Sequence, residues 1–245
     1  MAREKPQQIA DELRRAILAG EVADGELLGR EPELVERFGV SRPSLREALR
    51  ILEAEQLITV VRGVRGGVVV NAPDSRVTAR TAAMVLQARN VSIADVLEAR
   101  HLLEPLAVRT IASMRNRKRI VNELSALVDD VEAKIEDAEE FGVAFARFDE
   151  QLVVLAGNQT LAIVDEMLSA IVSRTVSAVR RAREVETPMP YRRRGIRSLR
   201  RLVELIDDGD AAAAEEHWRR HLAEVSETSV GENASALVDM VHHDT

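Results

Sequence analysis

The sequence predicts a mainly α-helical protein in two parts: a small N-terminal domain with a β-hairpin, and an all-α helical bundle of six or seven helices. Two observations predict this division. The short β-branched runs 57–61 and 68–70 both lie in the first third of the chain, and from residue 76 onward apolar residues recur at helical spacing. We place the N-terminal domain at 1–72, a linker at 73–76, the bundle at 77–230 and a flexible tail at 231–245.

Residues 39–58 predict the start and both faces of one helix. Ser41 suits the N-cap, and Pro43 suits the first turn, where its missing N–H costs nothing. Arg42, Arg46 and Arg50 lie four residues apart on one face, and no acidic partners for all three are evident. The buried stripe consists of Leu45, Ala48, Leu49 and Leu52.

A shorter helix is expected just upstream, in the segment 31–40, with Pro32 near its start and its end at Gly39. Two helices joined across three or four residues, the second with arginines near its N-terminal end, describe a helix-turn-helix. The second helix of this motif enters the major groove of DNA. The sequence therefore predicts a protein that binds double-stranded DNA.

The segment RGVRGG, residues 62–67, separates the two β-branched runs. It predicts a hairpin with a basic tip, in which glycine allows close approach of the backbone to a phosphate. An ordinary polar hairpin has the same pattern. Directly after a helix-turn-helix, however, this hairpin indicates the wing of a winged helix.

Residues 9–63, which include GVSRPSLREAL at 39–49, resemble the DNA-binding domain of GntR-family bacterial transcription regulators. The family has a glycine-valine-serine-arginine motif followed by valine-arginine-glutamate-alanine-leucine, and this part matches closely. In an earlier motif Pro32 stands where the family has a DNA-contacting arginine, and Arg30 is the substitute we propose. The resemblance and the local pattern together make the candidate DNA-binding residues Arg30, Ser41, Arg42, Ser44, Arg46, Arg62 and Gly63.

The charge balance argues mildly against DNA binding and has to be reconciled with it. Residues 1–72 carry 11 Lys and Arg against 12 Asp and Glu, and the whole chain has a net charge of −7. Non-specific affinity comes mainly from neutralising phosphates, so one domain of this charge should bind weakly. We therefore expect a homodimer that places two small basic faces on a short inverted-repeat operator.

The sequence also limits location and chemistry. It has no cysteine, no apolar run near the ~20 residues of a membrane span and no signal-peptide stretch, so we expect a cytoplasmic protein without a membrane partner. It contains no P-loop, nucleophile elbow or dinucleotide fingerprint, and we expect no enzyme. The alternatives are an all-α enzyme with Asp149 and His221 as an acid–base pair, or a scaffold that dimerises without a ligand.

The predicted bundle contains helices at 76–86, 92–114, 117–137, 140–156, 159–184, 190–208 and 211–230. Three of its segments, at 94–108, 148–159 and 198–222, resemble the FCD-type effector domain that defines the FadR branch of the GntR family. The resemblance implies a ligand-responsive regulator, which we expect to be a repressor released from DNA by its effector.

Many members of that branch hold a divalent metal with one Asp and three His. Here Asp149 and Leu199 stand at the first two His positions, Phe145 at or next to the Asp position, and His221 is retained. Two weak candidate ligands, Asp149 and His221, leave a metal shell incomplete, so we expect no cofactor. A metal-dependent regulator with an atypical site is the alternative.

Without a metal, the effector should contact the protein directly. The candidate effector-binding residues are Arg100, Asp149, Arg174, Leu199 and His221. Because a guanidinium pairs with carboxylate or phosphate in a fork, we expect an organic acid or an acyl-CoA. In the alternative interpretation Arg100 pairs with Glu104 or Asp149 and is structural. The basic cluster at 191–201 is either a solvated helix face or a phosphate patch for an acyl-CoA.

Overall fold

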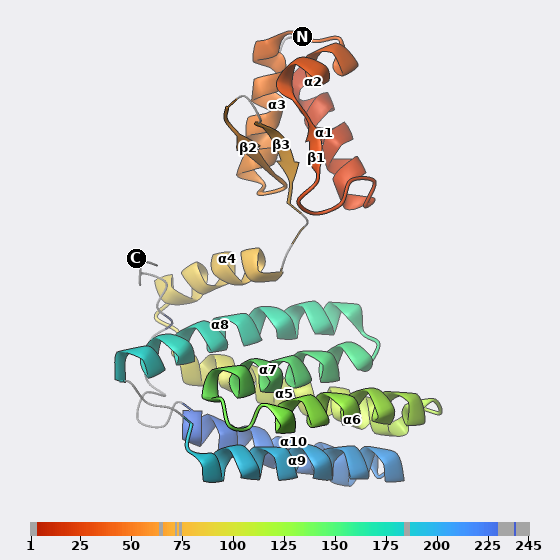
Figure 1. The fold of residues 1–245 in the computed structure, drawn as a ribbon, viewed down its shortest axis with the longest axis vertical. Helices are drawn as coiled ribbons and strands as arrows, with labels where there is room; N and C mark the ends of the chain where they lie inside the picture. Colours follow the sequence, from red (N-terminus) through yellow and green to blue (C-terminus); the bar gives the residue numbers. More distant parts are fainter. Residues whose placement is uncertain are drawn as a thin grey trace. The chain divides into compact units, whose positions relative to one another are not determined.

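The computed structural model describes residues 4–63, 66–71, 73, 75–183, 187–229 and 238. The chain forms two compact units, Met1–Val77 and Thr78–Thr245 (Figure 1). The described part of the first unit holds three helices and a small antiparallel sheet, and seven helices follow it. This confirms the predicted fold class, a winged helix-turn-helix followed by an all-α bundle.

The N-terminal unit consists of α1 (Glu4–Leu18), β1 (Leu27–Gly29), α2 (Glu31–Phe38), α3 (Arg42–Ala54), β2 (Ile58–Val61) and β3 (Gly67–Val70). Its strands pair in the order β1-β3-β2, and both pairings are antiparallel. The hairpin places Ile58 opposite Val70 and Val61 opposite Gly67. The elements α1 and β1 add to the predicted helix pair and hairpin; β1 has only three residues, too few to show a periodic pattern.

The turn between α2 and α3 follows from its local sequence. Gly39 takes the left-handed conformation, with φ of 59°, and so ends α2. The Ser41 hydroxyl then accepts a hydrogen bond from the backbone N–H of Ser44 and caps α3. The predicted stripe of α3 is buried, and it packs in one cluster with the α1 residues Ile9, Ala10, Leu13 and Ile17.

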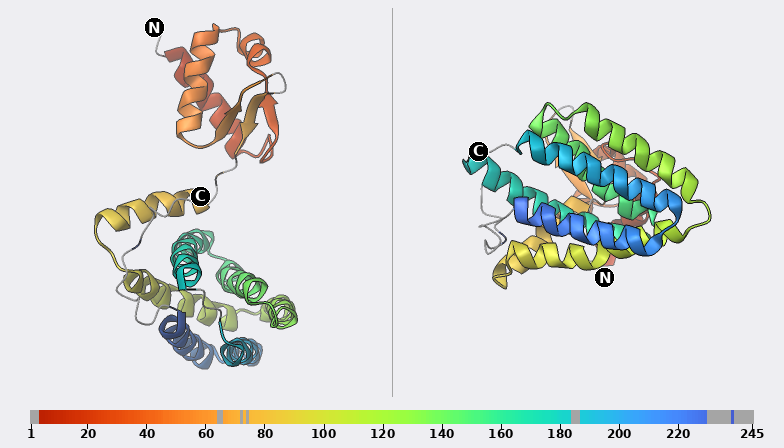
Figure 2. Two further views of the ribbon diagram at one scale, coloured as in Figure 1. Left: turned by 60° about the vertical axis from the view of Figure 1, so that its left-hand side comes forward. Right: turned by 90° about the horizontal axis from the view of Figure 1, so that it is seen from below.

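The seven helices of the bundle are α4 (Ser75–Ala88), α5 (Ile93–Ser113), α6 (Arg117–Ala133), α7 (Ala138–Leu155), α8 (Gln159–Arg183), α9 (Met189–Asp208) and α10 (Ala211–Ser229). The central helix is α5, which contacts α6, α7, α8, α9 and α10 (Figure 2). The main core is aliphatic around the fully buried rings of Phe148 and Trp218. No helix in the described ranges is both long and apolar enough to cross a membrane.

A second cluster in the bundle joins α4 to α5 and α8, through Ala79 and Ala83 on α4. Val238 also belongs to this cluster, and its backbone N–H donates to the carbonyl of Val91 at 3.1 Å. Val238 is the described residue of the segment 231–245, which we expected to be flexible. The remainder of that segment, including His242, His243 and Asp244, lies outside the described residues.

Candidate functional site

The exposed face of α3 carries the arginines that the sequence analysis singled out. Arg46 Nε lies 2.9 Å from Glu31 Oε1 at the start of α2, although 63% of the Arg46 side chain is exposed. Arg50 pairs more loosely with Glu47, at 3.4 Å. Arg42 is exposed, and it has no ion pair with any residue that the structure describes. On this face two guanidinium groups are therefore partly neutralised by acids of the same domain, and that of Arg42 is not paired within the described ranges.

Arg30, Ser41 and Ser44 lie beside these arginines at the starts of α2 and α3. The Ser41 and Ser44 hydroxyls are 2.9 Å apart and hydrogen-bond to each other. The Arg30 backbone N–H donates to the Glu33 carboxylate, and the Arg30 side chain is exposed. Because Glu31 reaches Arg46, the first turn of α2 lies next to α3. The structure thus brings the five candidate residues of the helix pair to one side of the domain.

The hairpin of β2 and β3 supplies the remaining candidates. Arg62 is exposed, and Gly63 has a φ of 118°, which a side-chain-bearing residue rarely adopts. Gly66 has no room for a side chain, because an added Cβ would lie 2.2 Å from the Val61 carbonyl oxygen. Residues 64 and 65, at the tip of the wing, lie outside the described residues, and the structure describes the hairpin up to Gly63 and again from Gly66.

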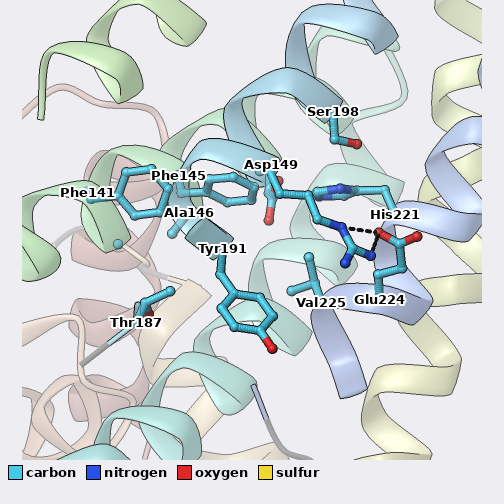
Figure 3. A pocket seen from close by; sticks show the side chains of 13 residues that line it. Phe141, Phe145, Ala146, Asp149, Thr187, Tyr191, Ser198, His221, Glu224 and Val225 are labelled. Atoms are coloured by element: carbon cyan, nitrogen blue, oxygen red, sulfur yellow. Dashed lines mark hydrogen bonds and ion pairs between the residues drawn. The ribbon is translucent and has the colours of Figure 1, made fainter. Parts of the chain in front are cut away.

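The bundle contains a cavity of about 200 Å³ between α7, α9 and α10 (Figure 3). Most of its lining is apolar or aromatic. The residues that line it are Phe141, Gly142, Phe145, Ala146, Asp149, Thr187, Tyr191, Arg194, Gly195, Ser198, His221, Glu224 and Val225. Asp149 and His221, two of the predicted effector residues, therefore share one cavity.

His221 is the buried imidazole of this cavity, with 5% of its surface exposed. Its ring stacks on Trp218, with ring centroids 4.6 Å apart, and on Phe145 at 5.8 Å. Burial lowers the pKa of His221 to about 4, and nearby His217 acts in the same direction. His221 is therefore neutral at physiological pH, with one ring nitrogen available as an acceptor.

Asp149 contributes a carboxyl group that the protein only partly satisfies. Its Oδ2 lies 3.7 Å from Arg100 Nη2, whereas its Oδ1 is buried and has no hydrogen-bond partner among the described residues. Burial, reinforced by nearby Glu104, raises the pKa of Asp149 well above its ordinary value, and Arg100 opposes this rise.

Behind the cavity Arg100 is held by its own helix. Its Nε lies 2.6 Å from Glu104 Oε1, and the other Glu104 oxygen accepts a hydrogen bond from Trp218 Nε1 at 2.9 Å. Arg100 is not among the residues that line the cavity. Asp165 is buried nearby, and burial together with Glu104 raises its pKa to about 7. Of the two interpretations of Arg100, the pairing with Glu104 and Asp149 is the one present in the structure.

Two expected effector residues are placed elsewhere. Arg174, expected in the interior, is exposed on α8, and Leu199 is fully buried in the main core. Neither lines the cavity. Successive residues of a helix are rotated by about 100°, so Ser198 faces the cavity while the adjacent Leu199 faces the core.

The basic cluster at 191–201 is partly neutralised by acidic side chains. Arg192 is buried and donates to backbone carbonyls, among them Ile135 at the end of α6 at 2.8 Å. Three exposed members form ion pairs: Arg194 with Glu224, Arg200 with Glu132 and Asp129, and Arg201 with Glu204. Arg193 and Arg197 are exposed and have no ion pair with any residue that the structure describes. The two interpretations of this cluster, a solvated helix face and a phosphate patch for an acyl-CoA, both remain predictions.

The sequence analysis did not identify the aromatic wall of the cavity. Phe141, Phe145 and Tyr191 are three of the six aromatic Phe, Trp and Tyr residues of the chain. Because aromatic residues are scarce in the rest of the chain, these three could have indicated a functional site. Their spacing in the sequence does not by itself predict that all three lie in one cavity. Ser198 was not predicted, because the resemblance placed its neighbour Leu199 in the site.

The donor set does not fit a closed metal site. In the described ranges no three His, Cys, Asp or Glu side chains gather as a metal site would require. Asp149 and His221 are two donors, and a structural or catalytic Zn²⁺ takes three or four from the protein. The structure thus assigns no residues beyond these two weak candidates to a metal.

Comparison with known proteins identifies both units. Residues 5–70 match the family "Bacterial regulatory proteins, gntR family", and residues 95–224 match the FCD domain. A solved structure described as Streptococcus agalactiae GntR superposes with a TM-score of 0.59 at 21% identity, covering 90% of this chain and 98% of that one. At that identity the superposition shows a shared fold.

Several bacterial regulators are similar in sequence. "Uncharacterized HTH-type transcriptional regulator YcbG" of Bacillus subtilis is 25% identical over 88% of this chain and 86% of its own length. The "Gluconate operon transcriptional repressor" of Bacillus subtilis is 29% identical over 60% of this chain, and the "Uxu operon regulator" of Haemophilus influenzae is 30% identical over 66%. The matches span 53% and 58% of those two proteins. The chain belongs to the GntR family of bacterial regulatory proteins, carries an FCD domain, and is a DNA-binding transcription regulator.

Proposed function

We propose that this regulator is a repressor that binds a short inverted-repeat operator as a homodimer and is released when a small molecule enters the α7–α9–α10 cavity. One observation carries the regulatory part: the FCD domain holds an aromatic cavity lined by His221 and by Asp149, whose buried Oδ1 has no hydrogen-bond partner among the described residues. The direction of control is supported by the printed name of a relative, the gluconate operon repressor. The DNA-binding part rests on the basic face of α3 and the adjacent wing.

The size and charge of the cavity narrow the choice of effector. A volume of about 200 Å³ is below the range of roughly 300–1,000 Å³ that suits drug-sized ligands, and so disfavours an acyl-CoA. A guanidinium is the group that we expected to pair with an organic acid. Arg100 is already held by Glu104, and Arg194, which lines the cavity, is paired with Glu224. The expectation of an organic acid therefore depends on breaking the Arg194–Glu224 pair.

The proposal of a homodimer has support on α5. Leu102 and Leu106 lie one turn apart, and they are 68% and 52% exposed. Two large apolar side chains at this spacing form an apolar face on the bundle, typical of a surface that a partner covers. Two-fold association would also place two α3 helices on two half-sites, which a single domain of net charge −1 needs for tight binding.

The operator is the direct test. Selection of bound duplexes from a random pool should yield an inverted repeat, with half-sites separated by about one helical turn. Sedimentation of the complex should give two chains per duplex. A single half-site bound by one chain would contradict the proposed dimer, and a pool without any enriched sequence would contradict sequence-specific binding. Small molecules that shift the melting temperature would then be tested for release of this operator.

A further inference from the structure

We propose that the α7–α9–α10 cavity binds a small organic cation, a molecule that carries a protonated amine on a compact apolar body. The cavity's role in regulation rests on the proposed function above. The chemistry of its ligand rests on the atoms that line it. This assignment differs from the organic acid that the sequence led us to expect.

Two buried polar groups of the cavity are not satisfied by the residues that the structure describes. Asp149 Oδ1 is buried without a hydrogen-bond partner, and neither ring nitrogen of His221 is hydrogen-bonded to any residue that the structure describes. Figure 3 shows the Asp149 carboxyl and the His221 ring next to each other, close to the ring of Phe145. An ammonium group has three N–H donors and satisfies both acceptors, whereas a carboxylate has none to offer them.

The buried charges around the cavity also favour a cation. Three carboxyl groups, those of Glu104, Asp149 and Asp165, lie near the guanidinium of Arg100, which is buried. The pKa values of Asp149 and Asp165 are both raised, chiefly by burial and then by Glu104. A bound cation supplies opposite charge where acid is in excess, and a bound anion would add to the repulsion. At the rim Arg194 and Glu224 compensate each other.

The walls suit the apolar body of such a ligand and add to the attraction for its charge. The rings of Phe141, Phe145 and Tyr191 line the cavity, and aromatic faces attract ammonium groups. Gly195 leaves room for this arrangement, because an added Cβ would come within 3.1 Å of the Phe145 ring. The small volume limits the ligand to a compact molecule, such as one with a single ring and a short amine chain.

Three probes of nearly equal size test which ligand charge the cavity prefers. They are 2-phenylethylamine, which is positively charged, 2-phenylethanol, which is neutral, and 3-phenylpropionate, which is negatively charged. Calorimetry and thermal denaturation of the full chain at neutral pH, without DNA, should show that the amine binds at least about tenfold more tightly than the carboxylate. Equal or tighter binding of 3-phenylpropionate would overturn the proposal. So would the lack of any stabilisation by 2-phenylethylamine, benzylamine and cyclohexylamine.

Variants tie the binding to this cavity. Asp149→Asn keeps the shape of the side chain but removes its negative charge, and should weaken amine binding at least about tenfold. The matched control Asp129→Asn, on the exposed face of α6, should leave it unchanged. Tyr191→Ala removes one aromatic wall at a position that is 47% exposed, so it should fold and also bind the amine more weakly. Full amine affinity in both cavity variants would place the site elsewhere and overturn the proposal.

Operator binding is measured separately, so that the two proposals fail in different ways. An amine that binds the cavity but leaves operator affinity unchanged supports the ligand chemistry and contradicts its regulatory role. Release of the operator by a small molecule of another class, with no amine binding, contradicts the ligand chemistry and leaves the proposed repressor standing.

Discussion

At the scale of single residues, Arg46 has two competing partners. In the DNA-free protein it pairs with Glu31 at 2.9 Å, and on an operator we expect it to contact a guanine edge. Arg46→Ala should cost about 1–3 kcal/mol of operator binding and relax base preference at one position. Mobility shifts on operator and random duplexes measure both effects. Unchanged operator affinity would remove Arg46 from the DNA contacts.

The same pair predicts the effect of removing its acid. Glu31→Gln abolishes the competing charge and lowers repulsion of the phosphates, so operator affinity should rise and depend more steeply on salt. Glu47→Gln is the matched control, because its 3.4 Å pair holds Arg50 rather than Arg46. A fall in affinity of Glu31→Gln would show instead that the Glu31 carboxylate orients Arg46 for DNA.

Asp165 makes stability depend on pH. Its pKa in the folded protein is about 7, against 3.8 for a free side chain. As pH rises above 3.8 the unfolded chain ionises while the folded one does not, so this group lowers stability progressively up to pH 7. Asp165→Asn should therefore raise the free energy of unfolding more at about pH 8 than at about pH 5. Equal gains at both pH values in urea denaturation would contradict the raised pKa.

Asp149 and His221 predict the response to metal removal. Two donors hold a divalent ion weakly, so a chelator should leave the melting temperature unchanged, and purified protein should contain little stoichiometric metal. Elemental analysis that finds one tightly bound ion per chain would favour the alternative, a metal-dependent regulator with an atypical site. The missing ligands would then have to be sought outside the described residues or in a partner chain.

At the scale of elements, the wing depends on Gly66. A Cβ at this position would lie 2.2 Å from the Val61 carbonyl oxygen, so Gly66→Ala must distort the hairpin beside Arg62. We expect weaker operator binding with little change in the melting of the bundle, measured by anisotropy and calorimetry. Unimpaired binding by Gly66→Ala would show that the wing does not contact DNA.

At the scale of the whole molecule, the exposed face of α5 predicts assembly. Replacing Leu102 and Leu106 together with glutamate should produce a monomer and weaken operator binding, because two half-sites would no longer be linked. Val143→Glu, at a position of α7 that is 66% exposed, is the control and should leave the oligomeric state unchanged. Sedimentation of each variant decides. A dimeric double variant would move the interface away from this face.

Local sequence by itself determined the helices and their ends. Ser41 caps α3, Gly39 ends α2, and the apolar stripe of α3 is buried as its period predicts. All seven helices after residue 75 begin within two or three residues of their expected starts. These features depend on contacts between residues three or four apart, which the order of residues specifies directly.

Only the tertiary structure decided which side chains share the cavity. Arg46 contacts Glu31, which is 15 residues away in the sequence, and Trp218 contacts Glu104, which is 114 residues away. The helical period does not predict contacts over such sequence separations. On α9, Leu199 is buried in the core and the adjacent Ser198 lines the cavity. The helical period of 3.6 residues does not indicate which of these two adjacent residues lines the cavity. The prediction that Arg100 would bind the carboxylate of a ligand failed for the same reason. Arg100 pairs with Asp149 instead, and this pair depends on how α5 packs against α7, which local sequence does not specify.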